Sequence, residues 1–165
     1  RAFERLMPQP GLSFLYRSDE GAIDAATWWR GALMLTGIFA VLTLGWILIE
    51  PFADKSLATT IIGTIVVLTG NLYRLAYGFI CVLLLISLYN LSAKRWRNLG
   101  RPSSFAGILP LAAAVTAALY WLEPRVDGDL PHYWIVAADI VLAGIFLWSV
   151  IELGDIRACI TALRR

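Results

Sequence analysis

Charged and metal-binding side chains are scarce in this sequence of 165 residues. Asp, Glu, Lys and Arg together make up 16% of it, whereas soluble domains carry about 25%. The single histidine, His132, and the two cysteines, Cys81 and Cys159, have no spacing typical of a metal site or a disulfide framework. A Gly-rich phosphate loop and a Ser-His-Asp set are also lacking. We therefore expect no catalytic site, metal or cofactor, and the lack of a basic tract gives nucleic-acid binding no support.

Apolar residues are what the sequence has in excess. Hydrophobic residues make up 59% of the chain and its mean hydropathy is +0.69, whereas soluble domains are about 45–50% apolar. A soluble protein of this size could not bury so much apolar surface in one core. Many of the seven tryptophans stand at the ends of apolar runs, which suits the interfaces of a membrane. The composition predicts an integral membrane protein.

Four apolar stretches are long enough to cross a bilayer, which takes about 20 mostly apolar residues in a helix. Asp24 precedes the first as a suitable N-cap, and prolines at 51 and 124 favour the ends of the first and third. The sequence therefore predicts an all-α, single-domain bundle of four transmembrane helices. The predicted spans are residues 28–49, 72–91, 104–122 and 133–153.

The apolar region around the second span is longer than a bilayer requires. As one helix, residues 57–91 would measure roughly 52 Å, well beyond a hydrocarbon core of about 30 Å. We therefore expect an extra apolar helix at residues 57–69, lying outside the bilayer, in its interface or against a partner. The alternative is a hairpin of two short segments that dips into the membrane and turns at Gly70 and Asn71.

Lysine and arginine are distributed unevenly between the two sides of this predicted bundle. Of the 14 in the chain, only Lys55, Arg74 and Arg125 fall on the side that faces away from the chain ends. Because positive residues accumulate in cytoplasmic segments, we expect residues 1–27 and 154–165 to be cytoplasmic.

Two ionisable residues fall inside predicted spans, at similar depths by residue count. Asp139 lies about two turns into the fourth span and Arg74 near the outer end of the second. A charge at such depth costs about 2.5–3.5 kcal/mol on insertion scales, so each needs a partner. We expect Arg74 and Asp139 to form an intramembrane ion pair.

The segment between the second and third predicted spans is strongly basic. Lys94, Arg95, Arg97 and Arg101 flank Trp96 in what we expect to be a loop. Each basic side chain near an anionic surface is worth about 1 kcal/mol, so the loop can bind lipid headgroups or an acidic partner. The alternative is that these charges only fix the topology. His132 stands beside aromatic residues at the opposite interface, and its role as a haem or pigment ligand is possible but less favoured than that of an interfacial ring.

Two sequence stretches carry a family resemblance. They read GAIDAATWW at residues 21–29 and AKRWRNLGRPSS at residues 93–104. These resemble motifs of the domain of unknown function 805 family of small bacterial inner-membrane proteins. The family's His-Asp pair is replaced here by Arg97 and Asn98. The resemblance implies a four-span fold in the bacterial inner membrane and assigns no activity.

The sequence favours a non-catalytic accessory or scaffold subunit that packs against a larger membrane complex, such as a photosynthetic or respiratory assembly. Its expected partners are membrane lipids and other integral membrane subunits. The alternative is a small transporter or channel that uses Arg74 and Asp139.

Overall fold

The computed structural model describes residues 11–53, 61–123, 126 and 131–155, and all regular structure in these residues is helical. Four helices are long and apolar enough to cross a membrane, which confirms the predicted four-span, all-α architecture of a multi-pass membrane protein. A short helix precedes the first of them, and a 3₁₀ turn lies between the second and the third. The elements are α1 (Leu12–Arg17), α2 (Ala25–Ala53), α3 (Ile61–Asn98), η2 (Ser103–Gly107), α4 (Ile108–Leu122) and α5 (Tyr133–Leu153).

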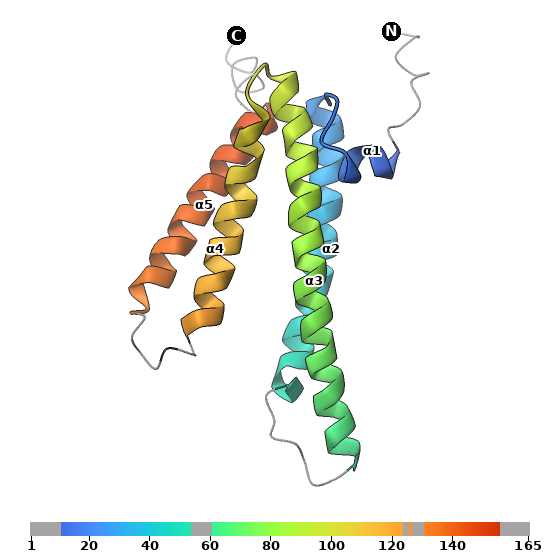
Figure 1. Cartoon of the computed structure of the whole chain (residues 1–165), viewed down its shortest axis with the longest axis vertical. Helices are drawn as coiled ribbons and strands as arrows, with labels where there is room; N and C mark the ends of the chain where they lie inside the picture. Colours follow the sequence, from blue (N-terminus) through green and yellow to red (C-terminus); the bar gives the residue numbers. More distant parts are fainter. Residues whose placement is uncertain (1–10, 54–60, 124–125, 127–130, 156–165) are drawn as a thin grey trace, which may run out of the picture.

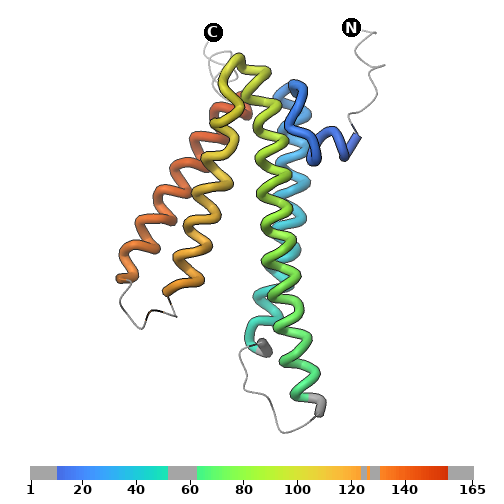
Figure 2. The backbone as a smooth tube through the Cα atoms, in the orientation of Figure 1, coloured from blue at the N-terminus to red at the C-terminus, as the bar shows by residue number. Residues whose placement is uncertain are grey.

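The four long helices form two antiparallel hairpins, α2 with α3 and α4 with α5 (Figure 1). The hairpins meet at one end and diverge toward the other. We call the end where they meet the basic end, because Lys94, Arg95, Arg97 and Arg101 lie there. Helix α1 lies across α3 at this end, and the α2–α3 hairpin extends well past α4 and α5 at the opposite end (Figure 2).

Helix α2 begins with the N-cap that the sequence predicts. The backbone N–H of Thr27 donates a hydrogen bond of 3.1 Å to the carboxylate of Asp24, so Asp24 caps the helix as expected. The end of α2 differs slightly from the prediction. The helix continues past Pro51 to Ala53, because a proline in the last turn removes only one backbone donor.

Helix α3 corrects the predicted division of the second apolar region. It is continuous over 38 residues, a length of about 57 Å, so residues 61–69 are its first turns and not a separate helix or half of a hairpin. Residues 57–60 lie outside the described part of the chain. At the expected break, Gly70 is buried and the Asn71 side-chain amide donates to the Val67 carbonyl at 2.9 Å. Asn71 is therefore accommodated inside the helix and does not start a turn.

Helices α2 and α3 are held together by tyrosines of α3. The hydroxyl of Tyr73 donates to the Leu42 carbonyl at 2.7 Å, and the hydroxyls of Tyr77 and Thr43 lie 3.1 Å apart. A Cβ on Gly45 would lie 2.4 Å from the Tyr73 hydroxyl, so the close approach requires glycine. These contacts pack α3 closely against α2.

The buried core lies at the basic end. Trp28 of α2, Leu91 and Trp96 of α3, Ala106 of η2 and Leu153 of α5 belong to one buried cluster. Farther from this end, large apolar side chains of all four long helices are exposed, as expected for surfaces that face lipid or partner helices. The fold therefore joins its elements firmly at one end.

Candidate functional site

The basic segment is the most highly organised polar region of the described structure. Lys94, Arg95 and Trp96 are only 0%, 4% and 1% exposed, and they belong to the last turns of α3. This corrects the expectation of a loop at these positions and removes Lys94, Arg95 and Trp96 from the predicted lipid contacts, whereas Arg97 and Arg101 stay at least partly exposed. The three side chains are buried because α3 continues to Asn98 and because α1, η2 and the end of α5 pack around it.

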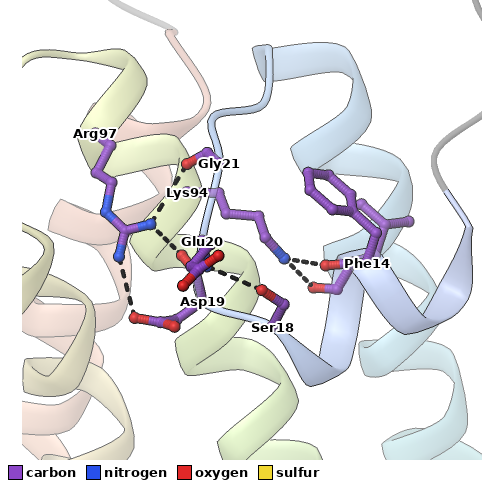
Figure 3. A network of polar contacts seen from close by, with 8 residues as sticks. Phe14, Ser18, Asp19, Glu20, Gly21, Lys94 and Arg97 are labelled. Carbon is purple, nitrogen blue, oxygen red and sulfur yellow. Dashed lines mark hydrogen bonds and ion pairs between the residues drawn. The ribbon is translucent and has the colours of Figure 1, made fainter.

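Lys94 fixes α1 to α3. Its ammonium group donates to the backbone carbonyls of Phe14 and Leu15, the latter at 3.1 Å, and lies 4.5 Å from the centre of the Phe14 ring (Figure 3). One turn earlier, the Asn90 amide donates to the Tyr16 carbonyl at 2.8 Å. The last carbonyls of a helix have no partners within it, so these side chains satisfy the exposed end of α1. A cation there is also favoured by the helix dipole.

Arg97 fixes the segment that joins α1 to α2. Its guanidinium forms an ion pair of 3.1 Å with the Asp19 carboxylate and donates to the backbone carbonyls of Asp19 and Gly21 (Figure 3). Gly21 has φ +94°, a backbone conformation that favours glycine, and a Cβ there would lie 2.9 Å from the Phe14 ring. Lys94 and Arg97 thus hold one continuous N-terminal segment against α3.

Arg95 joins α3 to the other hairpin. Its Nε donates to the carbonyl of Leu153 at 2.9 Å, and its guanidinium lies 3.7 Å from the Asp155 carboxylate. Arg101 forms an ion pair of 3.3 Å with Glu152, and its guanidinium lies 5.5 Å from the centre of the Trp96 ring. Arg95 therefore satisfies the C-terminal end of α5, as Lys94 does for α1.

An aromatic cluster completes the junction between the hairpins. Trp96 packs against Phe105 and Trp148, with ring centres 5.5 and 5.3 Å apart, and the indole N–H of Trp29 donates to the Gly154 carbonyl at 3.4 Å. The basic segment is thus a structural junction that unites α1, α3, η2 and α5. Its cations bind helix ends and the carboxylates of Asp19, Glu152 and Asp155.

A cavity of about 190 Å³ lies next to this junction, between the two hairpins. Most of its lining residues are apolar, and they include the aromatic residues Trp28, Trp29, Trp96 and Phe146. The hydroxyls of Thr36, Ser92 and Ser149 also line it, and Ser92 accepts a hydrogen bond of 3.4 Å from the indole N–H of Trp28. The cavity is therefore an apolar space with few polar groups, which suits a hydrocarbon chain or an apolar side chain.

Arg74 and Asp139 lie in different hairpins, and the structure does not bring them together. Arg74 lies over the Trp46 ring at 5.7 Å, whereas Asp139 accepts a hydrogen bond of 2.7 Å from the Tyr120 hydroxyl. Measured along the helices from the contact between Arg95 and Leu153, Arg74 lies about 31 Å away and Asp139 about 21 Å. The predicted ion pair is absent from the described residues because of this depth difference and because the hairpins diverge.

His132 lies at the start of α5, at the end opposite the basic cluster. Its exposed ring nitrogen Nδ1 lies 2.8 Å from the Glu123 carboxylate, so it joins the ends of α4 and α5. It does not line the cavity between the hairpins. Within the described residues, no group of three or more His, Cys, Asp or Glu side chains is arranged to hold a metal ion.

Comparison of the chain with models of protein families, with curated proteins and with solved structures found no match. The resemblance to the domain of unknown function 805 family therefore stays a prediction.

The partners of the basic residues were not predictable from the sequence. Helix α1 has only six residues, and its carbonyl groups cannot be recognised in a sequence as ligands for Lys94. The apolar run around Phe14 to Tyr16, close to Asp19, is the one sequence signal that could have indicated a docked N-terminal segment. The contact between Tyr120 and Asp139 was also missed, because it depends on the register of two helices.

Proposed function

We propose that this chain is a non-catalytic scaffold subunit that packs against other integral membrane subunits of a larger complex. The observation that carries the proposal is the divergence of the two hairpins from a single buried junction (Figure 1). A self-sufficient four-helix bundle packs its helices along their whole length. Here the facing sides of the hairpins beyond the junction are available to lipid or to a partner helix.

The polar groups of the long helices support a scaffold more than a transporter. They form hydrogen bonds within their own helix or with the neighbouring helix, as Ser87 does with the Leu83 carbonyl and Thr43 with Tyr77. A solute pathway needs polar groups that line a common route across the membrane. Arg74 and Asp139, the residues on which the transporter hypothesis depends, belong to separate hairpins.

The charge distribution supports a proposed orientation. The basic end carries Arg17, Arg30, Arg97 and Arg101 at exposed or partly exposed positions. Because such residues accumulate on the cytoplasmic side, we place the basic end, and with it both termini, in the cytoplasm. The bacterial inner membrane is the proposed location, which follows from the family resemblance. Exposed arginines at this end can also contact anionic lipids.

The proposal is tested by purifying the tagged full-length chain from its native membrane in mild detergent and identifying what accompanies it by mass spectrometry. A scaffold subunit brings defined integral membrane proteins in constant stoichiometry. Two adjacent, similarly exposed residues of α5 provide a matched pair of variants, since Phe146 lines the cavity and Leu147 does not. Phe146→Ala is expected to reduce recovery of the partners, whereas Leu147→Ala leaves it unchanged. Recovery of the chain with lipid alone, together with solute flux in proteoliposomes, would support a transporter instead.

A further inference from the structure

Helix α3 extends far beyond the hairpin formed by α4 and α5 (Figure 2). Measured from the contact between Arg95 and Leu153, α5 extends about 30 Å to Tyr133, whereas α3 extends about 51 Å to Ile61. Tyr133 and Trp134 pack together at the end of α5, and Trp46 packs on Tyr77 at a comparable level of the other hairpin. Such aromatic residues mark a membrane interface. A bilayer bounded at this level would leave the first turns of α3 outside it.

An apolar stripe follows α3 from this projection into the membrane. Its seven side chains are between 52% and 73% exposed, and their spacing alternates between three and four residues. This is the spacing of the a and d positions of a heptad repeat, sustained over three heptads. The stripe consists of Ile65, Leu68, Leu72, Leu75, Phe79, Val82 and Ile86.

The stripe is separate from the surfaces that α3 uses inside the chain. Tyr73 and Tyr77 contact α2, and Leu88 and Ser92 line the cavity between the hairpins. Beyond Ile86, the face that continues the stripe is covered by α1, with Asn90 and Lys94 bonded to its carbonyls. At the basic end, this side of α3 is therefore already a packing surface, and α1 of the same chain covers it.

Lipid can cover only part of the stripe. Counted along α3 from Arg95, Phe79, Val82 and Ile86 lie within about 24 Å, inside a bilayer bounded at the aromatic level. Ile65 and Leu68 lie about 40–45 Å away, beyond that level, where their exposed apolar side chains would face water. The occupant must therefore be a structure that follows α3 out of the bilayer. A helix with the same heptad repeat meets this requirement.

We propose that the stripe forms a parallel, two-stranded coiled coil with α3 of a second copy of this chain. All copies insert with one topology, so two α3 helices related by a two-fold axis along the membrane normal are parallel and at equal depth. Each a and d residue then meets its own counterpart. Gly78, beside the stripe, has open space around its Cβ position and allows close approach of the second helix. This inference does not depend on the proposed scaffold function.

The stripe supplies a substantial part of the area that a dimer interface needs. Complete burial removes about 60–120 Å² of surface per large apolar side chain, so seven half-exposed side chains contribute roughly 250–500 Å² per copy. Residues at the flanking positions add to this. The stripe alone thus supplies about a third to two thirds of the roughly 800 Å² per partner of a specific protein interface, and the flanking residues must supply the rest.

The dimer is tested by disulfide cross-linking of single-cysteine variants in native membranes, in a background that carries Cys81→Ser and Cys159→Ser. Leu68→Cys, Leu72→Cys and Leu75→Cys are expected to form dimers of the chain on mild oxidation. Leu44→Cys and Leu48→Cys of α2 are the matched controls, because these leucines are equally exposed and lie in the same hairpin. Little cross-linking is expected from them. Equal cross-linking of the α2 variants would overturn the proposal.

A second measurement uses the projecting turns alone. Leu68→Asp places a charge in the interface but outside the bilayer, so membrane insertion is unaffected. It is expected to raise the dissociation constant of the detergent-purified dimer about tenfold or more, whereas Leu68→Met retains the dimer. A monomeric wild-type chain without cross-links, or cross-linking of Leu68→Cys to a different polypeptide, would contradict self-association. Dimers without other subunits would support this inference and overturn the scaffold function.

Discussion

The Nε of Arg95 donates a hydrogen bond of 2.9 Å to the backbone carbonyl of Leu153, although the two residues lie 58 positions apart in the sequence. This bond connects the last turns of α3 to the end of α5 and so joins the two hairpins. Both residues are almost fully buried, which makes the contact insensitive to salt. The bond fixes the depth of the last turn of α3 relative to the end of α5.

Replacement of Arg95 by methionine is expected to lower the free energy of unfolding by about 1.5–3 kcal/mol, because a charged hydrogen bond to a buried carbonyl is lost. Thermal unfolding in detergent measures the change. Arg101→Gln is the control, since Arg101 is 46% exposed in its ion pair with Glu152 and such pairs contribute about 0–1 kcal/mol. An equal effect of the two substitutions would show that Arg95 is not the main connection between the hairpins.

Lys94→Met is expected to release α1 from α3 without disturbing the contact between α3 and α5. The carbonyls of Phe14 and Leu15 lose their donor, and methionine retains most of the apolar stem. Hydrogen–deuterium exchange should show faster exchange in α1 and in the segment up to Gly21. Protection of α5 should be unchanged. Unaltered exchange in α1 would mean that other contacts suffice to hold it.

Gly45→Ala is expected to destabilise the α2–α3 hairpin by about 1–3 kcal/mol, because the new Cβ would lie 2.4 Å from the Tyr73 hydroxyl oxygen. Gly37 of the same helix is the matched control, since its Cβ position has no neighbour within 4 Å. Gly37→Ala should therefore be neutral or slightly stabilising. Addition of Tyr73→Phe to Gly45→Ala removes the clashing oxygen and should restore part of the lost stability, as measured by thermal unfolding.

The capping of α2 predicts a dependence of stability on pH. Hydrogen bonds from Thr27, chiefly that of its side chain and also that of its backbone N–H, lower the pKa of Asp24 below its usual value of 3.8. A carboxyl group with a lowered folded-state pKa stabilises the fold above its unfolded-state pKa, and this contribution is lost as the pH falls through the folded-state pKa. The melting temperature of the wild type should therefore decrease below about pH 4 more than that of Asp24→Asn. Asparagine still caps the helix but does not titrate. Identical pH profiles would show that Asp24 makes no such contribution.

The sequence predicted the four spans because long apolar runs are read directly from composition. It also predicted the Asp24 cap, which depends on residues three positions apart. It did not predict the continuity of α3, because Gly70 and Asn71 indicate a turn, whereas in the structure the Asn71 amide bonds to the Val67 carbonyl within the helix. The burial of Lys94 and Arg95 was missed for a different reason. Their partners are backbone carbonyls of α1 and α5, and any sequence offers such groups at every residue.

The most direct test of this account is a pair of distance measurements by pulsed electron spin resonance, on chains reconstituted in lipid nanodiscs and diluted with unlabelled chain. One labelled pair, Asn98→Cys with Ile151→Cys, reports on the basic end. The other, Leu75→Cys with Val136→Cys, reports on the opposite end. The account predicts a clearly longer distance for the second pair, because the hairpins diverge from their junction. Similar distances at the two ends, as in four helices packed along their whole length, would contradict it.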